Sequence, residues 1–322
     1  MFVDGLISTI IPVHNRPLLL REAVASVLAQ TYRPVEIIIV DDGSTDETLR
    51  EAETLAQAHP EVRAIHRQNG GPGAARETGR LAARGEFIQY LDSDDLLLPT
   101  KFARQVTGLR EHGDCAVSYG KTRRYSYGDR PTDVAWKRTG ERIQAMFPSF
   151  LQSRWWGTST PLYRRNATDL AGPWTELNNE EDWEYDCRIA RNGGQLHYCD
   201  AFVSEERVTS GHHLSTSGSS DPEKLRSRAR AHKLILEHAL AARISHKASE
   251  MQNFARELFL LARQCGAAGL ADEARILFDL ARHASGVERS RSIDFLLYGA
   301  GARLVGWRAM GSLACRLDRF RA

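Results

Sequence analysis

The sequence predicts an α/β fold in which a mixed, mostly parallel sheet is flanked by helices, and two observations lead to this prediction. Short apolar runs rich in β-branched residues alternate with longer segments whose apolar residues recur at helical spacing. Each apolar run also ends in polar or glycine-containing sequence, where a turn is expected. This alternation is typical of right-handed βαβ units, which build a parallel sheet covered by helices on both faces.

The expected elements follow one another from near the N-terminus. Residues 6–13 are an apolar run that predicts a buried strand, and Leu20, Val24 and Val27 mark one face of the helix after it. In full, strands are expected at 6–13, 35–40, 62–66 and 87–91, helices at 16–31 and 46–59, and a third helix after the glycine loop at 69–76. Farther along, residues 195–208 predict two short strands.

Composition limits the classes of function. At 322 residues the chain is long enough for one large domain and a smaller appendage. The formal net charge of +2 argues against extensive nucleic-acid binding. The five cysteines form no Cys-x-x-Cys pair, so no zinc or redox motif is predicted. The apolar run at residues 6–13 is too short for a signal sequence and has no basic leader, and no apolar run is long enough to span a bilayer, so we expect a cytoplasmic protein.

Four polar clusters follow the ends of the expected strands. They are Pro12 to Arg16, Asp41 to Asp46, Asn69 to Arg76, and Asp92 to Asp95. Ligands of open α/β sheets bind beyond the carboxyl ends of the strands, so these clusters are expected to line one crevice. The first loop has no Gly-x-Gly-x-x-Gly pattern, which argues against a dinucleotide-binding dehydrogenase.

The most acidic of these clusters lies at the end of the fourth strand. Asp92, Asp94 and Asp95 stand between apolar runs, where three carboxylates repel one another unless a cation neutralises them or they stay hydrated. Oxygen ligands of this kind suit Mg²⁺ or Mn²⁺. The alternative is a hydrated loop whose aspartates cap a helix.

Five motifs occur together in a characteristic order. They are Ile11-Pro12-Val13-His14-Asn15-Arg16, Val40-Asp41-Asp42-Gly43-Ser44-Thr45-Asp46, Asn69-Gly70-Gly71 with Ala75-Arg76, Leu91-Asp92-Ser93-Asp94-Asp95, and Glu181-Asp182-Trp183-Glu184. With these motifs the sequence resembles the inverting glycosyltransferases of family 2, whose nucleotide-sugar-binding fold is called GT-A. The resemblance covers roughly residues 5–215.

The resemblance implies a metal site and a nucleotide site. Asp92, Asp94 and Asp95 would bind Mg²⁺ or Mn²⁺ beside the donor diphosphate, with His213 of a late loop as a further ligand; His212 could serve equally, and a surface histidine is the alternative. The Asp41-Asp42 turn would read the base, with Asp42 making the contact. The residues implied to contact the nucleotide are Pro12, His14, Asn15, Arg16, Asp41, Asp42, Asn69, Arg76, Asp92 and Ser93. His14 stands where relatives often carry an aromatic residue, and a solvated surface position is the alternative for Arg76.

The resemblance also implies an acceptor side. Asp182 would act as the general base that deprotonates the acceptor hydroxyl. The residues implied on this side are Trp156, Thr160, Glu181 and Trp183. Aromatic residues are more often part of a core, and acids in the first turn of a helix also complement its dipole, so both structural alternatives stay open.

The remaining sequence is helical. We expect a catalytic domain at 1–215, a helical extension at 216–289 that includes a helical hairpin around Gly266 to Gly269, and a basic amphipathic helix at 290–322. Ile293, Leu297 and Leu304 share one face of that last helix. Its arginines are Arg303, Arg308, Arg316, Arg319 and Arg321. Such a helix either lies on an anionic membrane surface or docks on protein, and we favour the membrane.

The function expected from these features is metal-dependent inverting transfer of a sugar from a nucleoside-diphosphate donor, a UDP-sugar, to a hydroxyl of a glycan or lipid-linked acceptor in bacterial surface polysaccharide or glycoconjugate synthesis. A peripheral location on the inner face of the membrane would suit a lipid-linked acceptor. Two alternatives remain: a nucleotidyltransferase, which should carry a glycine-rich loop with Arg and Lys after its first strand, and a non-catalytic binding or scaffold protein on the same fold.

Overall fold

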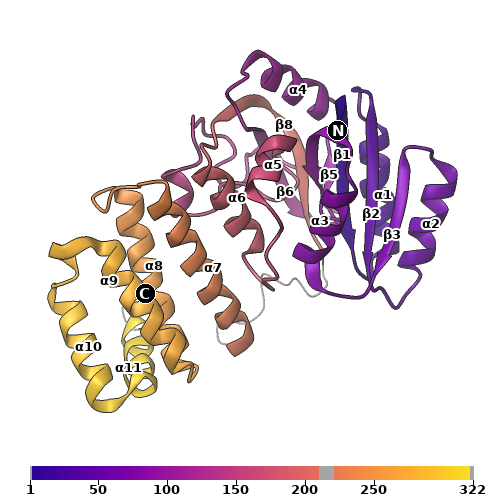
Figure 1. The fold of residues 1–322 in the computed structure, drawn as a ribbon. Coiled ribbons are helices and arrows are strands. Elements are labelled where there is room, and N and C mark those ends of the chain that lie inside the picture. The colour runs from indigo at the N-terminus through magenta and orange to yellow at the C-terminus, as the bar shows by residue number, and fades with distance from the viewer. Residues whose placement is uncertain (1, 210–220, 320–322) are drawn as a thin grey trace. The chain divides into compact units, whose positions relative to one another are not determined.

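The computed structural model describes residues 2–209 and 221–319, which divide into two compact units (Figure 1). The sheet unit comprises Met1–Met146, Arg154–Glu176 and Asn192–Gly211. The helical unit comprises Phe147–Ser153, Leu177–Arg191 and His212–Ala322. Both units are therefore built from separate stretches of the chain. His212, His213 and Arg321 lie outside the described residues.

The sheet unit is organised by one mixed sheet with the strand order β3-β2-β1-β4-β7-β6-β8-β5. Its strands are β1 Val3–Val13, β2 Val35–Asp42, β3 Val62–Arg67, β4 Gly85–Tyr90, β5 Leu96–Leu97, β6 Val117–Ser126, β7 Leu162–Arg164 and β8 Leu196–Val208. β1 pairs in parallel with β2 and β4, and β2 pairs in parallel with β3. β7 is antiparallel to both β4 and β6. The predicted mixed, mostly parallel sheet is confirmed.

Helices cover both faces of the parallel strands. The helices of this unit are α1 Pro17–Leu28, α2 Thr48–Ala58, α3 Gly71–Ala82, α4 Lys101–Glu111 and α5 Arg165–Ala171. One core cluster packs Leu20 and Val24 of α1 against Ile7 and Ile11 of β1. Because side chains alternate along a strand, Ile10 points to the opposite face, where α3 lies.

The approach of α3 to the sheet requires a glycine. A Cβ atom added to Gly79 would lie 2.3 Å from Cγ2 of Ile10, which is closer than carbon atoms can approach. Gly79 therefore allows α3 to press directly on β1. This contact sets the depth of the whole helix, including Arg76, which lies one turn earlier and is only 4% exposed.

Residues 195–208 form one strand, β8, and not the two short strands expected from the sequence. The strand instead stays continuous because its parallel pairing with β6 shifts register on either side of Lys121. Such irregularities accommodate an extra residue without ending a strand.

The helical unit consists of helices, of which α7 to α11 follow one another through short turns. They are the 3₁₀ helix η1 Ser149–Leu151 and the α-helices α6 Glu181–Arg191, α7 Pro222–Ala241, α8 Ser249–Ala267, α9 Ala271–Arg289, α10 Ile293–Val305 and α11 Trp307–Arg319. α8 and α9 form the expected hairpin, with Gly269 in the turn at a φ of 84°. Phe254 and Leu258 of α8 and Leu277 of α9 are buried. We expected the residues of η1 and α6 to belong to the catalytic domain at 1–215, whereas their contacts group them with these helices.

The prediction of a single helix at 290–322 was wrong, because the segment contains two helices, α10 and α11. They are separated by Gly306, whose φ of 87° lies in the left-handed region that favours glycine and ends a helix. The side chains of α10 that pack on the unit are Phe295, Tyr298 and Ala302. The predicted apolar face is largely exposed, with Leu304 84% accessible. Within the described residues, no helix combines the length and the apolar character needed to cross a bilayer.

Candidate active site

The polar loops that follow β1, β2 and β4 are joined by hydrogen bonds at one edge of the sheet. Asn15, after β1, accepts a hydrogen bond from the backbone N–H of Thr45 at 2.8 Å, and its own N–H donates to Oγ of Ser44 at 3.0 Å. Arg16 reaches across to Asp94 in the loop after β4. The structure therefore brings together clusters that are far apart in the sequence, at the carboxyl ends of parallel strands, as we expected.

Asp92 and Asp94 each face a guanidinium group. Nη2 of Arg76 lies 2.8 Å from Oδ1 of Asp92, and Nη1 of Arg16 lies 2.5 Å from Oδ2 of Asp94. The guanidinium carbon of Arg76 also lies 4.9 Å from the centre of the Trp174 ring. Because Arg76 is buried and oriented by these contacts, it is not a solvated surface arginine. Both aspartates are partly accessible, with 33% of the Asp92 side chain and 13% of the Asp94 side chain exposed.

Asp95 differs from its two neighbours because it is buried and bonded to the protein on both oxygens. Oγ of Ser159 donates to Oδ2 at 2.6 Å, and the backbone N–H of Arg207 donates to Oδ1 at 3.2 Å. Burial raises the pKa of Asp95 well above its ordinary value, and the charges of Asp94, Glu206 and Asp92 raise it further. Because both of its oxygens are used in these contacts, Asp95 is better placed to hold the loop than to bind a ligand directly.

The Asp41-Asp42 turn is also engaged by the protein. The Asp42 carboxylate accepts hydrogen bonds from the backbone N–H groups of Gly70 and Gly71, and it forms an ion pair with Arg67. Oδ2 of Asp41 lies 2.7 Å from Nδ1 of His66. In this structure Asp42 therefore fixes the glycine loop at the start of α3. Its contact with a base stays a prediction.

A glycine is required where the loops after β2 and β3 meet. Gly43 has a φ of 70°, and a Cβ atom there would lie 2.7 Å from the backbone nitrogen of Asn69. This close approach lets Nδ2 of Asn69 donate to the carbonyl of Asp42 at 2.9 Å. Nδ1 of His14 lies 3.0 Å from the same carbonyl. His14 and Asn69 therefore stand side by side and exposed at this edge, whereas Pro12 and Ser93 are buried.

Two residues of β8 belong to this cluster although we did not predict them from the sequence. Arg207 is buried, and its Nε donates to the carbonyl of Asp94 at 2.6 Å. Glu206 is 24% exposed and interacts electrostatically with Asp92 and Asp94. The available signal was the run Glu205-Glu206-Arg207, which places charged residues inside an expected strand.

Burial raises the pKa of Glu206 to about 7, even though the nearby cations Lys137 and Arg124 act in the opposite direction. The negative charges of Asp92 and Asp94 add to the increase. Oε1 of Glu206 lies 3.4 Å from Nε of Arg124. A carboxyl group that titrates near neutral pH is therefore placed beside the two accessible aspartates.

The predicted acceptor residues of the sheet unit are buried. Trp156 is 0% exposed, and its ring centre lies 5.1 Å from that of Tyr119. Thr160 is also 0% exposed, and its Oγ1 lies 2.6 Å from Oγ1 of Thr122. Both side chains pack as core residues do, so a direct contact with an acceptor stays a prediction and would require them to become accessible.

The predicted base and its neighbours lie in the helical unit, in the first turn of α6. Oδ1 of Asp182 accepts from the backbone N–H of Trp183 at 2.7 Å. Nε1 of Trp183 donates to the carbonyl of Phe150 at 2.8 Å, and the ring meets those of His232 and Phe254 edge to face. Glu181 is buried. Trp183 is therefore held by the helical unit, while Asp182 is partly accessible.

The turn before α6 is strained and is held by ion pairs. Glu180 has a φ of 61°, which is unusual for a residue other than glycine. Its carboxylate lies 3.0 Å from both Nε of Arg228 and Nδ1 of His232. Although burial raises the pKa of Glu180, His232 and Arg228 hold it below its ordinary value. Contacts within the helical unit thus fix the backbone that presents Asp182.

The donor chemistry at Asp92 and Asp94 fits a hard divalent cation. No group of three or more His, Cys, Asp or Glu residues is arranged to hold a metal within residues 2–209 and 221–319. Mg²⁺, however, is usually bound by one or two carboxylates, with water and substrate phosphates completing its shell. Two partly accessible carboxylates on one loop match that mode. The predicted ligand His213 lies outside the described residues.

The pKa of Glu206 predicts a pH-dependent effect of the substitution Glu206→Gln. A folded-state pKa of about 7 exceeds the ordinary value of 4.5, so the stabilising contribution of the protonated carboxyl is complete below about pH 4.5 and is lost as the pH rises through about 7. A glutamine side chain is uncharged at every pH, so the variant does not lose this stability as the pH rises. Urea unfolding with a chelator present should therefore show that the variant gains roughly 1–3 kcal/mol relative to the parent between about pH 5 and pH 8.5. The substitution Glu53→Gln, at an exposed position, serves as the control. If the difference in unfolding free energy between Glu206→Gln and the parent is the same at both pH values, the raised pKa of Glu206 is wrong.

Comparisons with known proteins agree with this geometry. Residues 8–166 match the family described as glycosyl transferase family 2. An uncharacterized glycosyltransferase of Rickettsia felis is 42% identical over 109 residues, which are 34% of this chain and 18% of that protein. The uncharacterized glycosyltransferase EpsJ of Bacillus subtilis is 40% identical over 99 residues, or 31% of this chain and 29% of the relative. The chain thus spans less than a third of the length of these curated relatives.

Solved structures show the same fold. Residues 1–349 of Staphylococcus aureus TarS, in complex with UDP-GlcNAc, match with a TM-score of 0.70 and 20% identity over 97% of this chain and 92% of that chain. The mannosyltransferase PcManGT of Pyrobaculum calidifontis, with GDP-Man and Mn²⁺, matches with a TM-score of 0.51 and 18% identity over 95% of this chain and 84% of that chain. The sheet order and the solved structures show the GT-A fold, and within it residues 8–166 form a domain that matches glycosyl transferase family 2.

Proposed function

We propose that the chain is an inverting glycosyltransferase that moves a sugar from a nucleoside-diphosphate donor, a UDP-sugar, to a hydroxyl of a glycan or lipid-linked acceptor in bacterial glycan synthesis. The observation that carries this proposal is the pairing of Asp92 with Arg76 and of Asp94 with Arg16 at the carboxyl edge of the sheet. Carboxylates and guanidinium groups placed together suit a diphosphate and its counterion. The relatives support the donor class, since TarS is described with UDP-GlcNAc and PcManGT with GDP-Man.

Arg16 and Arg76 would bind the diphosphate. A guanidinium group presents several N–H donors in one plane and matches two phosphate oxygens at once. Arg76 also lies in the first turns of α3, where backbone N–H groups and the helix dipole favour anions. His14 and Asn69, both exposed beside the Asp41-Asp42 turn, would lie along the base and ribose.

Asp92 and Asp94 would hold the cation, Mg²⁺ or Mn²⁺. When bound, such an ion neutralises the charge that grows on the departing diphosphate. PcManGT is described with Mn²⁺, which supports this choice. Asp95 would be a positioning residue, because its hydrogen bonds to Ser159 and Arg207 hold the loop that carries Asp92 and Asp94.

Asp182 would act as the general base for the acceptor hydroxyl. A carboxylate can accept a proton only if it stays reachable, and Asp182 is the partly accessible acid between the buried Glu181 and Glu184. The strained turn at Glu180 fixes its backbone. Proton transfer to a positioned base contributes about 10²- to 10⁴-fold to the rate of such reactions.

The C-terminal helices would bring the chain to an anionic membrane surface. Several large apolar side chains on α10 and α11 are more than half exposed. These residues are Ile293, Leu296, Leu297, Leu304, Val305, Leu313 and Leu317. Asp294 and Asp318 are neutralised by Arg289 and Arg263. Arg303, Arg308 and Arg316 remain exposed, so an apolar face carries excess positive charge. A helix with these two properties is more suited to binding a bilayer that contains anionic lipids than to packing on an uncharged protein surface.

The first test is metal-dependent release of UDP from a panel of UDP-sugars. We expect release that requires Mg²⁺ or Mn²⁺ and is lost in Asp94→Ala, because a ligand of the cation and the partner of Arg16 are removed together. Asp129→Ala, at an exposed position, is the matched control. Release that is unchanged by chelator and by Asp94→Ala would contradict the proposal, and donor binding without any release would support a non-catalytic binding protein.

The second test separates the base from donor binding. Asp182→Asn keeps the size of the side chain but removes its ability to accept a proton, so turnover should fall by about 10²- to 10⁴-fold. Affinity for the UDP-sugar, measured by calorimetry in the presence of metal, should stay unchanged. Turnover close to that of the parent would refute the role of Asp182.

The third test concerns the membrane. The double variant Leu297→Ser, Leu304→Ser removes apolar area from exposed positions, so folding should be preserved while sedimentation with phosphatidylglycerol vesicles is reduced. Leu18→Ser, at another exposed position of the chain, is the control. If the parent protein stays in the supernatant with these vesicles, the membrane proposal fails.

A further inference from the structure

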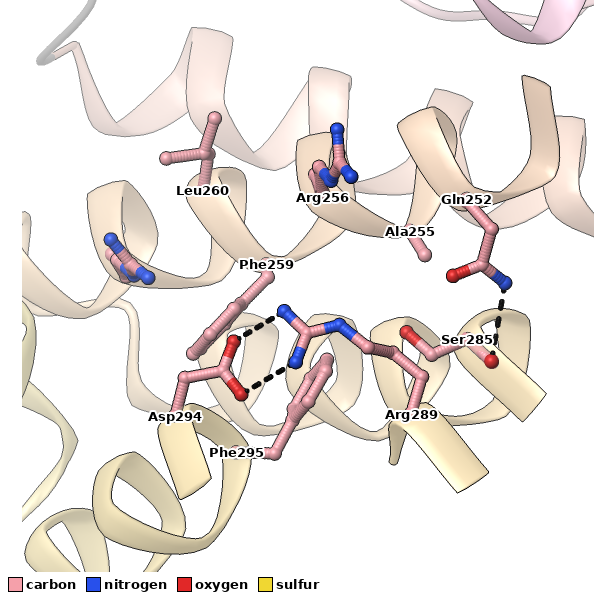
Figure 2. Close-up of a pocket in the computed structure, with 10 residues that line it drawn as sticks. Gln252, Ala255, Arg256, Phe259, Leu260, Ser285, Arg289, Asp294 and Phe295 are labelled. Atoms are coloured by element: carbon pink, nitrogen blue, oxygen red, sulfur yellow. Dashed lines mark hydrogen bonds and ion pairs between the residues drawn. The ribbon is translucent and has the colours of Figure 1, made fainter. Parts of the chain in front are cut away.

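The helical unit contains a pocket of about 240 Å³ where α8, α9 and the start of α10 meet (Figure 2). Its lining comes from three consecutive helices. α8 contributes Gln252, Arg256, Phe259 and Arg263, α9 contributes Ser285 and Arg289, and α10 contributes Asp294 and Phe295. None of these residues has a role in the proposed transfer reaction.

Positive charge exceeds negative charge around this pocket. Arg256, Arg263 and Arg289 line it, and Asp294 is the acid among the described lining residues. Arg289 binds Asp294 through two N–H groups, at 2.9 and 2.7 Å (Figure 2). Arg263 uses Nη1 to bind Asp318 outside the pocket, and its Nε is buried without a hydrogen-bond partner within the part of the chain that the structure describes.

Arg256 is the most available of the three cations. It is exposed, and within the described residues its guanidinium group makes a long hydrogen bond of 3.3 Å, from Nη1 to Oδ1 of Asn253. A guanidinium group has five N–H donors, so most of those on Arg256 are open to a ligand. Guanidinium donors therefore outnumber the carboxylate acceptors that face this pocket.

Aromatic rings hold two of the guanidinium groups in place. The rings of Phe259 and Phe295 stack with their centres 4.7 Å apart and their planes 16° from parallel. The guanidinium carbon of Arg263 lies 4.3 Å from the centre of the Phe259 ring, and that of Arg289 lies 5.7 Å from the centre of the Phe295 ring. An arginine stacked on a ring keeps its N–H edge free for a planar or tetrahedral anion.

We propose that this pocket binds a phosphate group, either free in solution or as the headgroup of a lipid. Phosphate is the anion that matches the paired N–H donors of arginine, and the Phe259 and Phe295 rings offer apolar surface to atoms attached to it. The volume of about 240 Å³ is below the roughly 300–1,000 Å³ of pockets that enclose drug-sized ligands. The pocket is therefore too small to enclose a whole nucleotide sugar, and its residues are not those proposed to bind the donor.

Asp294 has a defined place in this proposal, because its carboxylate occupies the edge of Arg289 that a phosphate would use. The bound phosphate shares or displaces this contact. Asp294→Asn removes the competing charge and should strengthen phosphate binding several-fold. Arg256→Gln removes open donors and should weaken it about tenfold, which corresponds to the loss of one charge-assisted hydrogen bond.

The test measures binding of inorganic phosphate and of glycerol 3-phosphate to the full chain by calorimetry, at constant ionic strength set with chloride. Arg275→Gln on α9 makes the same charge change away from the pocket and should bind as the parent does. Thermal unfolding without phosphate checks that each variant is folded. Because Arg256 is exposed, its replacement should not unfold the unit, and Asp294→Asn gives a second measurement of opposite sign.

Vesicles distinguish the two sources of phosphate. Binding of the soluble phosphates, weakened by Arg256→Gln and strengthened by Asp294→Asn, supports a site for free phosphate. The same pattern seen only with phosphatidic acid vesicles, compared with phosphatidylcholine vesicles, supports a lipid headgroup. Equal effects of Arg256→Gln and Arg275→Gln, or no binding to any of these probes, would overturn the proposal. Because these experiments measure phosphate binding and not sugar transfer, their failure would not bear on the proposed transferase activity.

Discussion

The ion pairs Arg16–Asp94 and Arg76–Asp92 are the interactions on which the candidate site depends. They tie the loop after β4 to the loop after β1 and to α3, so three elements are fixed at one edge of the sheet. The cost of bringing Asp92, Asp94 and Asp95 together is offset by these guanidinium groups and by the hydrogen bonds to Asp95. The carboxylates, which would otherwise repel one another, are thus held in position before any ligand arrives, so the binding of the proposed diphosphate would require little rearrangement of the site.

Backbone packing explains how the arginines reach these positions. Gly79 allows α3 to lie directly on β1, which buries Arg76 beside Asp92, and Gly43 lets the loops after β2 and β3 touch. Asp42 then fixes the glycine loop at the start of α3 through the N–H groups of Gly70 and Gly71. Residues that the motif alone assigns to ligand contact therefore also build the site. A carboxylate with this structural role is sensitive to substitution even if it never touches the nucleotide.

The helical unit uses arginine in a different way. On α8 and α9, Arg263 and Arg289 stack on aromatic rings and neutralise Asp318 and Asp294, which leaves a cationic pocket beside exposed apolar residues of α10. In the sheet unit the guanidinium groups face carboxylates of the candidate site. The chain thus carries one cluster of paired arginines and aspartates, which we propose binds a diphosphate with a cation, and one pocket with excess positive charge, which we propose binds a single phosphate.

The sequence by itself determined the first four strands and the three helices between them, the hairpin of α8 and α9, and the grouping of Asp92 to Asp95 with three other polar loops. These features follow from local periodicity, from turn residues and from the rule that parallel strands end at one edge, so short-range patterns suffice. Only the tertiary structure decided that Arg16 pairs with Asp94, 78 residues away, that Glu206 and Arg207 join the site, that Trp156 is buried, and that Gly306 divides the last segment. Pairing and burial depend on which elements meet in space, and spacing along one segment carries no information about its distant partners.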